Sequence, residues 1–377
     1  MTDSVPSFRA PVRQRTGHIT GGHWLARIAM LAAVACALPM VAVALAALTG
    51  GTDTVQHLAE TVLGRYTATT IGLVLMVSVG TFAIGVGAAW LVTMTRFPGV
   101  RFFEIALVLP LAFPAYVLAY AYTHVLDHPG VVQSLLRDVT GWGPRDYWFP
   151  EIRSLGGAAA MLILVLYPYV YLLARAAFLQ QSATTFLAAR ALGSSAWSAF
   201  FRISLPLARP AIAGGVLLAV METIADFGTV AYFGVQTFAT GIYTSWFSLA
   251  DRAGAAQLAL CLLSFALLLA MLERAQRGRA QYHDPSRRQE GMEPAQLSRR
   301  QSAVAMFMCG IPVLFGAGLP VVILLSMAIG SEQNLLSPRY IGFVQNSLTL
   351  ASIAAIVTVA AAISIGFYQR LVPGRKS

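Results

Sequence analysis

The chain has 377 residues, of which 57% are hydrophobic and 11% charged, with a mean hydropathy of +0.67. Water-soluble domains carry about 25% charged residues, so this composition excludes the soluble globular class. The net charge of +10 would suit nucleic acid, but the basic residues lie in short segments between apolar runs. That placement indicates membrane topology, and we predict no nucleic-acid partner. Cys36, Cys261 and Cys309 fall inside apolar runs at unrelated spacings, so they predict neither a disulfide framework nor a metal site.

The apolar runs predict an all-α polytopic membrane protein. Residues 1–23 are polar and basic and are predicted to form a cytoplasmic tail. The first apolar run could instead be a signal peptide, but it is too long for a signal core of about 7–15 residues. Each run is long enough to cross a hydrocarbon core of about 30 Å. About eight spans are expected, at residues 24–48, 67–95, 102–124, 155–179, 208–232, 253–272, 304–329 and 344–369.

Arginine and lysine are concentrated in alternate segments between the predicted spans. One set contains Arg96 and Arg101, then Arg190 and Arg202, and then the basic segment 273–303. The other set holds few basic residues, and these are mixed with carboxylates. Because basic loops stay in the cytoplasm, the N-terminus is predicted to be cytoplasmic.

Residues 187–206, which we call the elbow, lie between the fourth and fifth predicted spans on the cytoplasmic side. Gly193 is expected to take a positive φ and to end a short helix. Ser194 or Ser195 would cap a second helix, which Pro206 would end. Three aromatic residues spaced i, i+3 and i+4 would form one face of that helix, namely Trp197, Phe200 and Phe201. The elbow contains no carboxylate, and its aromatic face predicts a docking element.

The fifth predicted span contains Glu222 and Asp226, spaced so that both would face one side of a helix. A carboxylate inside a membrane is costly and must face a bundle interior or an aqueous path. The pair therefore predicts either a substrate pathway, with Tyr232 as a third candidate, or a structural hydrogen-bonding pair. Gly228 and Gly234 would permit close helix packing or local unwinding.

Two further segments depart from simple spans. Pro110 and Pro114 interrupt the third run, which predicts either a broken helix lining a cavity or, in preference, a kinked packing helix. The segment 236–257 is too polar to span, and Tyr243, Trp246 and Phe247 in it predict an interfacial helix.

The sequence contains no enzyme signature. It has no Gly-rich phosphate loop, no His-Glu-x-x-His and no Gly-x-Ser-x-Gly. We therefore predict no catalytic residue and no cofactor bound by this chain, and no metal ligand can be assigned. ATP-driven work would need a partner subunit.

The segment 273–303 predicts a linker, and the residues after it echo the start of the chain. Leu319-Pro320 resembles Leu38-Pro39, and Val372-Pro373-Gly374 resembles Phe97-Pro98-Gly99. The two offsets agree to within about ten residues, which predicts an internal duplication.

The elbow carries a spacing that resembles the cytoplasmic "EAA" loop of ATP-binding-cassette (ABC) importer permeases of the MetI-like family. The resemblance implies that this loop docks on a dimer of ATPase subunits. Leu187 stands where the family usually has Glu, which puts one polar contact with the ATPase in doubt. The matching residues are Ala188, Ala189, Gly193, Ile203, Leu205 and Pro206, beside the aromatic Trp197 and Phe200.

The stretch 205–249 resembles the ferric-iron branch of that family, for example in Met221-Glu222-Thr223-Ile224-Ala225-Asp226. The resemblance implies iron(III) delivered by a periplasmic binding protein, a bacterial inner-membrane location, and twelve spans in two repeats. Residues 24–272 would form one complete six-helix repeat, 273–303 a cytoplasmic linker, and 304–377 the first two helices of a second repeat. A second elbow would fall about 90 residues beyond Pro373, so this repeat is expected to be incomplete.

Several alternatives stay open at this stage. An importer of the same class for polyamine, thiamine or phosphonate is one. A secondary transporter or channel is another, and a non-functional truncated product is a third. The expected partners are the ATPase dimer, the binding protein, a second permease copy that supplies another elbow, and membrane lipid.

Overall fold

The structure is a computed structural model that describes residues 22–144, 146–181, 193, 195–277, 295–331 and 337–371. The chain divides into two units, Met1–Ala42 with Gln333–Ser377, and Val43–Glu332. Within the described residues, seven helices are long and apolar enough to span a membrane, and the bent pair Val100–Ala112 and Ala115–Thr140 adds an eighth. The prediction of an all-α polytopic protein with about eight spans is confirmed. Most of the predicted tail, residues 1–21, lies outside the described part.

The smaller unit contributes two apolar helices. α1 (Gly22–Leu48) passes into the larger unit at Val43, and α16 (Pro338–Leu371) is one uninterrupted helix. Apolar side chains on α16 are exposed, for example Leu350 at 72% and Ile356 at 69%. A helix that is apolar on its exposed faces is typical of a membrane span.

Three long helices form the centre of the larger unit. α2 (Gly51–Leu58) continues through a π-helical turn, η1 (Ala59–Leu63), into α3 (Gly64–Met94). α3 packs against α7 (Leu155–Leu179), and α7 packs against α10 (Leu205–Ala225). Glycines allow both approaches, because a Cβ at Gly85 of α3 or Gly215 of α10 would lie less than 3 Å from Val170 of α7. Small residues at such contacts are how membrane helices pack closely.

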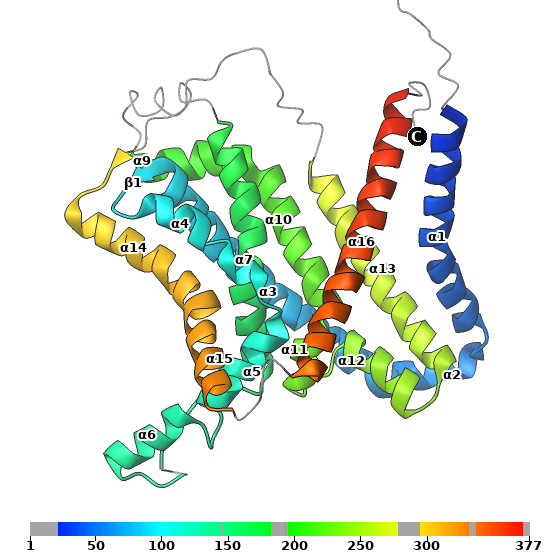
Figure 1. Ribbon diagram of the computed structural model, residues 1–377, viewed down its shortest axis with the longest axis horizontal. Coiled ribbons are helices and arrows are strands. Elements are labelled where there is room, and N and C mark those ends of the chain that lie inside the picture. Colours follow the sequence, from blue (N-terminus) through cyan, green and yellow to red (C-terminus); the bar gives the residue numbers. More distant parts are fainter. Residues whose placement is uncertain are drawn as a thin grey trace, which may run out of the picture. The chain divides into compact units, whose positions relative to one another are not determined.

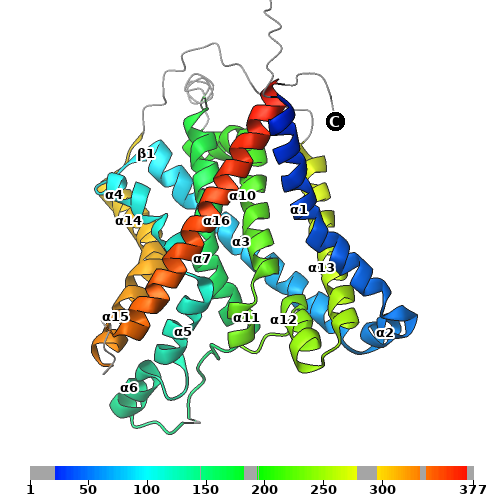
Figure 2. The same cartoon turned by 45° about the vertical axis from the view of Figure 1, so that its right-hand side comes forward.

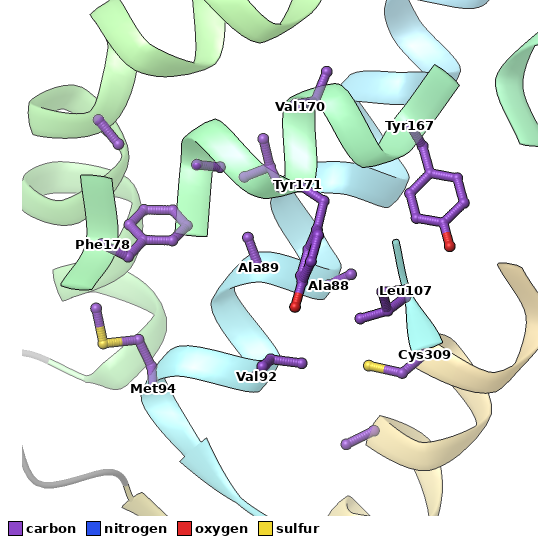
Figure 3. Close-up of a cluster of buried hydrophobic side chains, with 14 of the residues drawn as sticks. Ala88, Ala89, Val92, Met94, Leu107, Tyr167, Val170, Tyr171, Phe178 and Cys309 are labelled. Atoms are coloured by element: carbon purple, nitrogen blue, oxygen red, sulfur yellow. The ribbon is translucent and has the colours of Figure 1, made fainter. Parts of the chain in front are cut away.

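The core of this unit lies between α3 and α7. Tyr167, Tyr171 and Phe178 of α7 are fully buried. Figure 3 shows the Tyr171 ring beside Ala88 and Ala89 of α3, with Leu107 and Cys309 close by. Cys309 comes from α14 (Arg299–Val313), so α14 packs on the same core.

The connecting segments are sorted to two opposite ends of this unit (Figures 1 and 2). One end carries α2, α6 (Val131–Thr140), α11 (Gly228–Tyr232), α12 (Phe238–Tyr243) and η4 (Thr244–Ser248), and the spanning helix α13 (Arg252–Arg277) follows η4 in the chain. The other end carries α9 (Ala196–Ala199) and the strands β1 (Thr95–Arg96) and β2 (Ala295–Gln296). This sorting follows the alternation of the arginine pattern. Which end faces the cytoplasm stays a prediction.

β1 and β2 join the second-to-third span connection to the end of the predicted linker. The strands are parallel, with Thr95 opposite Ala295. Ser298 then caps α14 through a reciprocal pair with Gln301. α13 reaches Arg277 and α14 begins at Arg299, so helices occupy part of the segment predicted as linker. α14 continues through η5 (Leu314–Gly318) into α15 (Leu319–Ile329).

The third span is broken rather than kinked, so the preferred prediction was wrong and its alternative is correct. The break separates α4 (Val100–Ala106) and the 3₁₀ turn η2 (Leu109–Ala112) from α5 (Ala115–Leu126), and the segments Val100–Ala112 and Ala115–Thr140 on its two sides are bent by 91°. A residue before proline is disfavoured from helical conformation. Phe113, directly before Pro114, is accordingly extended, with φ −105° and ψ 129°.

The fifth span was predicted wrongly at both ends. The chain is helical from Ala196 through η3 (Phe200–Ser204) to Ala225, instead of from 208 to 232. Pro206 does not end this helix, contrary to prediction. η3 is a π-helical turn in which the Leu205 N–H reaches back to the Phe200 carbonyl. Pro206 then falls in the first turn of α10, where a missing N–H is tolerated.

Candidate functional site

A cavity of about 350 Å³ lies where the broken third span meets α7 and α10. Residues 111–116, on both sides of the break, form one wall. α7 contributes an apolar face with Tyr169 at its edge, and α10 contributes Glu222. Asp226, directly after α10, completes the lining. The structure thus brings the two predicted carboxylates and one of the two predicted helix-breaking prolines, Pro114, into the lining of one cavity.

Asp226 has a structural task as well as a place in the cavity. It lies just beyond α10, with ψ 122°, so the prediction that it shares a helix with Glu222 was wrong. Its Oδ1 accepts hydrogen bonds from the backbone N–H groups of Thr229 (3.0 Å) and Val230 (3.2 Å). Its Oδ2 accepts from the Thr229 hydroxyl at 3.0 Å. Asp226 therefore holds the start of α11 while facing the cavity.

Tyr232 is placed elsewhere and is not among the residues that line this cavity. Its ring lies beneath the guanidinium of Arg153, 5.2 Å from ring centroid to Cζ. Arg153 also donates to Asp127 at 3.0 Å, and this hydrogen bond lowers the pKa of Asp127 below its ordinary value. Tyr232 thus belongs to a contact between the connections at the α6 end.

Two tyrosines of the lining were missed by the sequence reasoning, Tyr116 and Tyr169. A Cβ on Gly228 would lie 3.1 Å from the Cβ of Tyr116, so α11 packs closely on α5. Close helix packing is one of the two roles predicted for Gly228 and Gly234. Gly234 takes φ +69°, a left-handed conformation that fits the other predicted role, local unwinding of the helix. The signal that could have found Tyr169 is a phenol next to a proline inside an apolar span.

Carboxylates in the lining of a cavity attract cations and repel anions. Among the described residues lining the cavity there is no Arg or Lys. No group of three or more His, Cys, Asp or Glu side chains suited to a metal ion occurs within the described residues.

Two local predictions for the elbow, at Gly193 and at the helix cap, are confirmed. Gly193 has φ +88°, the left-handed conformation expected of it. Of the two candidate caps, Ser195 is the one seen, because its Oγ accepts from the Ser198 N–H at 3.1 Å. Leu187, Ala188 and Ala189 lie outside the described residues, as does the side chain of Trp197.

The predicted aromatic docking face is wrong for Phe200. Its side chain is only 6% exposed, and its ring centroid lies 4.4 Å from that of Trp90 on α3. Phe201 is 57% exposed and remains available at the surface of the elbow. Ile203, Leu205 and Pro206 are half-buried.

Three polar contacts connect the elbow and the broken span to α7 or to the residues directly after it. The Gln181 side chain, two residues after α7, donates to the Ser204 carbonyl at 2.8 Å. Arg175 of α7 pairs with Glu104 of α4 at 3.2 Å, and the Tyr171 hydroxyl donates to the Glu104 carbonyl at 3.1 Å. The elbow's exit and the first half of the broken span are therefore both tied to α7.

A family described as "Binding-protein-dependent transport system inner membrane component" matches residues 81–281, more than half of the chain. The chain belongs to this family. The resemblance drawn from the elbow is thereby confirmed, and the protein is a multi-pass membrane component.

Curated relatives share moderate identity with this family member. This chain is 23% identical over 347 residues to the Fe(3+)-transport system permease protein FbpB 2 of Haemophilus influenzae. The aligned region covers 91% of this chain and 64% of that protein. The chain thus spans slightly less than two thirds of that relative's length. It is 29% identical over 194 residues to the molybdenum transport system permease protein ModB of Escherichia coli, covering 50% of this chain and 81% of that one.

Solved structures share the fold. A bacterial alginate ABC transporter, in complex with a periplasmic protein that carries an alginate pentasaccharide, superposes with a TM-score of 0.56 at 18% identity. The match covers 68% of this chain and 94% of the other. The fold is therefore that of an ABC transporter permease.

Proposed function

We propose that this chain is the permease subunit of an ABC importer and that the cavity is part of its translocation path. The observation that carries the proposal is the cavity between the broken third span and the carboxylates of Glu222 and Asp226. Non-helical backbone at membrane depth is tolerated where it lines a cavity, and carboxylates there mark ion paths. Binding of ATP and protein partners at the two ends would shift the path between its two openings.

The proposed substrate is ferric iron. Its support is the acidic lining together with the similarity to permeases named for Fe(3+) transport. Molybdate and sulfate, for which other relatives are named, are anions that this lining would repel. Polyamine and thiamine are cations, so an importer for one of these is the second candidate; phosphonate has less support.

The elbow is the proposed contact for a separate ATPase dimer that carries ATP, while this chain hydrolyses none. A second permease copy would supply the other elbow of a two-fold complex, and a periplasmic protein would deliver substrate from the opposite end. A secondary transporter or channel would need no elbow, so ATPase association separates these classes.

Gly193→Val tests the elbow. A Cβ at this position meets nothing within 4 Å, so the substitution acts only through strain at φ +88°. Gly141→Val is a matched control, because Gly141 has φ +72° and open space but lies at the C-terminal end of α6. We expect Gly193→Val to lose co-purification with the ATPase subunit and Gly141→Val to keep it. Equal co-purification by both variants would contradict the docking role.

Glu222→Gln tests the path and the substrate class. In a strain lacking the natural copy, uptake of iron(III) is compared with uptake of putrescine, thiamine and molybdate. We expect iron uptake that falls about tenfold in Glu222→Gln, as the loss of about 1.4 kcal/mol of stabilisation would produce. Glu60→Gln, at an exposed carboxylate on η1, is the control. Uptake of molybdate but not of any cation would overturn the assignment.

A further inference from the structure

α6 exposes an apolar surface that the proposed path does not use. Its aliphatic side chains occupy an arc of about 100° around the helix axis, at 3.6 residues per turn. We call this surface the α6 stripe; it consists of Val131 (62% exposed), Val132 (38%), Leu135 (61%) and Val139 (77%). A continuous exposed apolar strip on one helix face marks an interaction surface more often than scattered apolar residues do.

The opposite face of α6 is fixed to the rest of the α5–α7 connection. Gln133 is 7% exposed and donates to the Leu126 carbonyl at 3.0 Å. Arg137 donates to the Tyr147 hydroxyl and to the His128 carbonyl, both at 3.0 Å. The Tyr147 hydroxyl in turn donates to Gln133 at 2.9 Å. These bonds prevent α6 from rotating its stripe inward, so the stripe is presented in one orientation.

Two exposed tryptophans follow the C-terminal end of α6 in the chain. Trp142 is 47% exposed and its ring stacks on that of Tyr147, with centroids 5.9 Å apart and planes 24° apart. Trp148 is 85% exposed. Exposed, oriented tryptophans are over-represented among the residues that carry protein–protein binding energy.

The position of α6 favours a protein over lipid. In both views α6 lies beyond the ends of α5 and α15, the neighbouring parts of the spans (Figures 1 and 2). Exposed Asp138 lies on the helix beside the stripe, and exposed Asp146 lies beyond its end. Carboxylates so close to the apolar strip would be unfavourable if the strip were sunk into hydrocarbon.

We infer that the α6 stripe is a docking surface for the solute-binding protein that serves this permease. The inference rests on the proposed function, since it places a binding protein at the α6 end. The family is described as binding-protein-dependent, and the alginate transporter of similar fold was crystallised with a periplasmic protein. An apolar centre bordered by polar groups is the usual anatomy of such an interface.

Photo-crosslinking in intact cells tests the surface by capturing whichever molecule contacts it. p-Benzoylphenylalanine replaces Leu135 in the stripe, or Thr140, an exposed residue about 140° away on the same helix, as the matched control. After irradiation, adducts are identified by mass spectrometry. We expect an adduct with a periplasmic solute-binding protein at position 135 and at least a fivefold weaker one at 140. Adducts with lipid, adducts with a second copy of this chain, or no adduct would each overturn the inference.

A second variant separates failure of this inference from failure of the proposed function. Leu135→Asp should lower iron(III) uptake about tenfold, while Thr140→Asp leaves it within twofold and both variants keep the ATPase subunit. If Leu135→Asp transports normally and a binding protein crosslinks at Trp246 on η4 instead, only the α6 inference fails. If neither an ATPase subunit nor a binding protein associates with the unaltered chain, the proposed function itself fails.

Discussion

The third and fifth spans each contain two prolines, but only the third span is broken. Pro110 and Pro114 lie in the middle of the third span, which bends by 91°. Pro206 and Pro210 lie just as far into the fifth span, which stays helical from Ala196 to Ala225 with Pro210 inside the helix. Neither the number of prolines nor their distance from the start of the span therefore decides whether the span breaks.

The backbone around each pair explains the difference. In the fifth span, the π-helical turn η3 precedes Pro206 and widens the hydrogen-bond spacing by one residue, so the proline adds no break. In the third span, Phe113 is forced into an extended conformation before Pro114, and the helix restarts at Ala115. The backbone around that break then lines the cavity. Four sets of substitutions would sharpen or break this comparison.

The largest effect is expected for the double substitution Pro110→Ala with Pro114→Ala. Proline costs about 3 kcal/mol more than alanine inside a helix, so the double variant favours a continuous third span. A continuous helix removes the cavity wall at residues 111–116, and uptake should fall tenfold or more. Uptake assays with protein of verified folding check this. Unchanged uptake would show that the break is not needed.

Asp226 tests where the fifth span ends. Asp226→Ala removes the acceptors for the N–H groups of Thr229 and Val230, and should cost about 1 kcal/mol of unfolding free energy. Asp226→Asn keeps an acceptor oxygen and should restore most of that stability, measured by thermal unfolding in detergent. If the charge also serves the path, both variants lose uptake. Full uptake in Asp226→Asn would leave Asp226 with a structural role only.

Gln181 tests how the start of the fifth span is held. Gln181→Ala removes the hydrogen bond to the Ser204 carbonyl, worth about 1 kcal/mol, and should weaken ATPase association. Gln180→Ala, at the exposed neighbouring residue, is the control. Identical ATPase binding by the two variants would show that this bond does not position the elbow.

The smallest effect is expected for Pro206→Ala. The helix already continues through this position, so alanine changes only the freedom of the unfolded chain, by less than about 1 kcal/mol. Uptake and ATPase binding should match those of the natural chain. A large loss in either would mean that Pro206, rather than η3, maintains the local geometry.

Local rules were sufficient for many features of this protein. Apolar run length predicted the spans, and the arginine pattern predicted which connections share an end. The left-handed Gly193 and the Ser195 cap also came from short-range sequence rules, because the groups involved are neighbours in the chain.

Features that depend on distant residues were not predictable in this way. Burial of Phe200 requires Trp90 from α3, and the π-helical turn beside it has no sequence signature of its own. The turn of Asp226 toward Thr229 depends on where α10 stops. Tyr169 enters the lining only because the third span breaks beside α7.

The hydrogen bond from Gln181 to Ser204 has a thermodynamic consequence for any partner of the elbow. It joins two points 23 residues apart in the chain, beside the packed helices α7 and α10. Bringing the ends of a flexible loop of that length together costs roughly 3 kcal/mol of chain entropy. This entropy is lost when the protein folds, so the ends of the loop are already fixed in place when a partner binds the elbow. Binding then loses less entropy in ordering the loop, and more of the contact energy between elbow and partner appears as affinity.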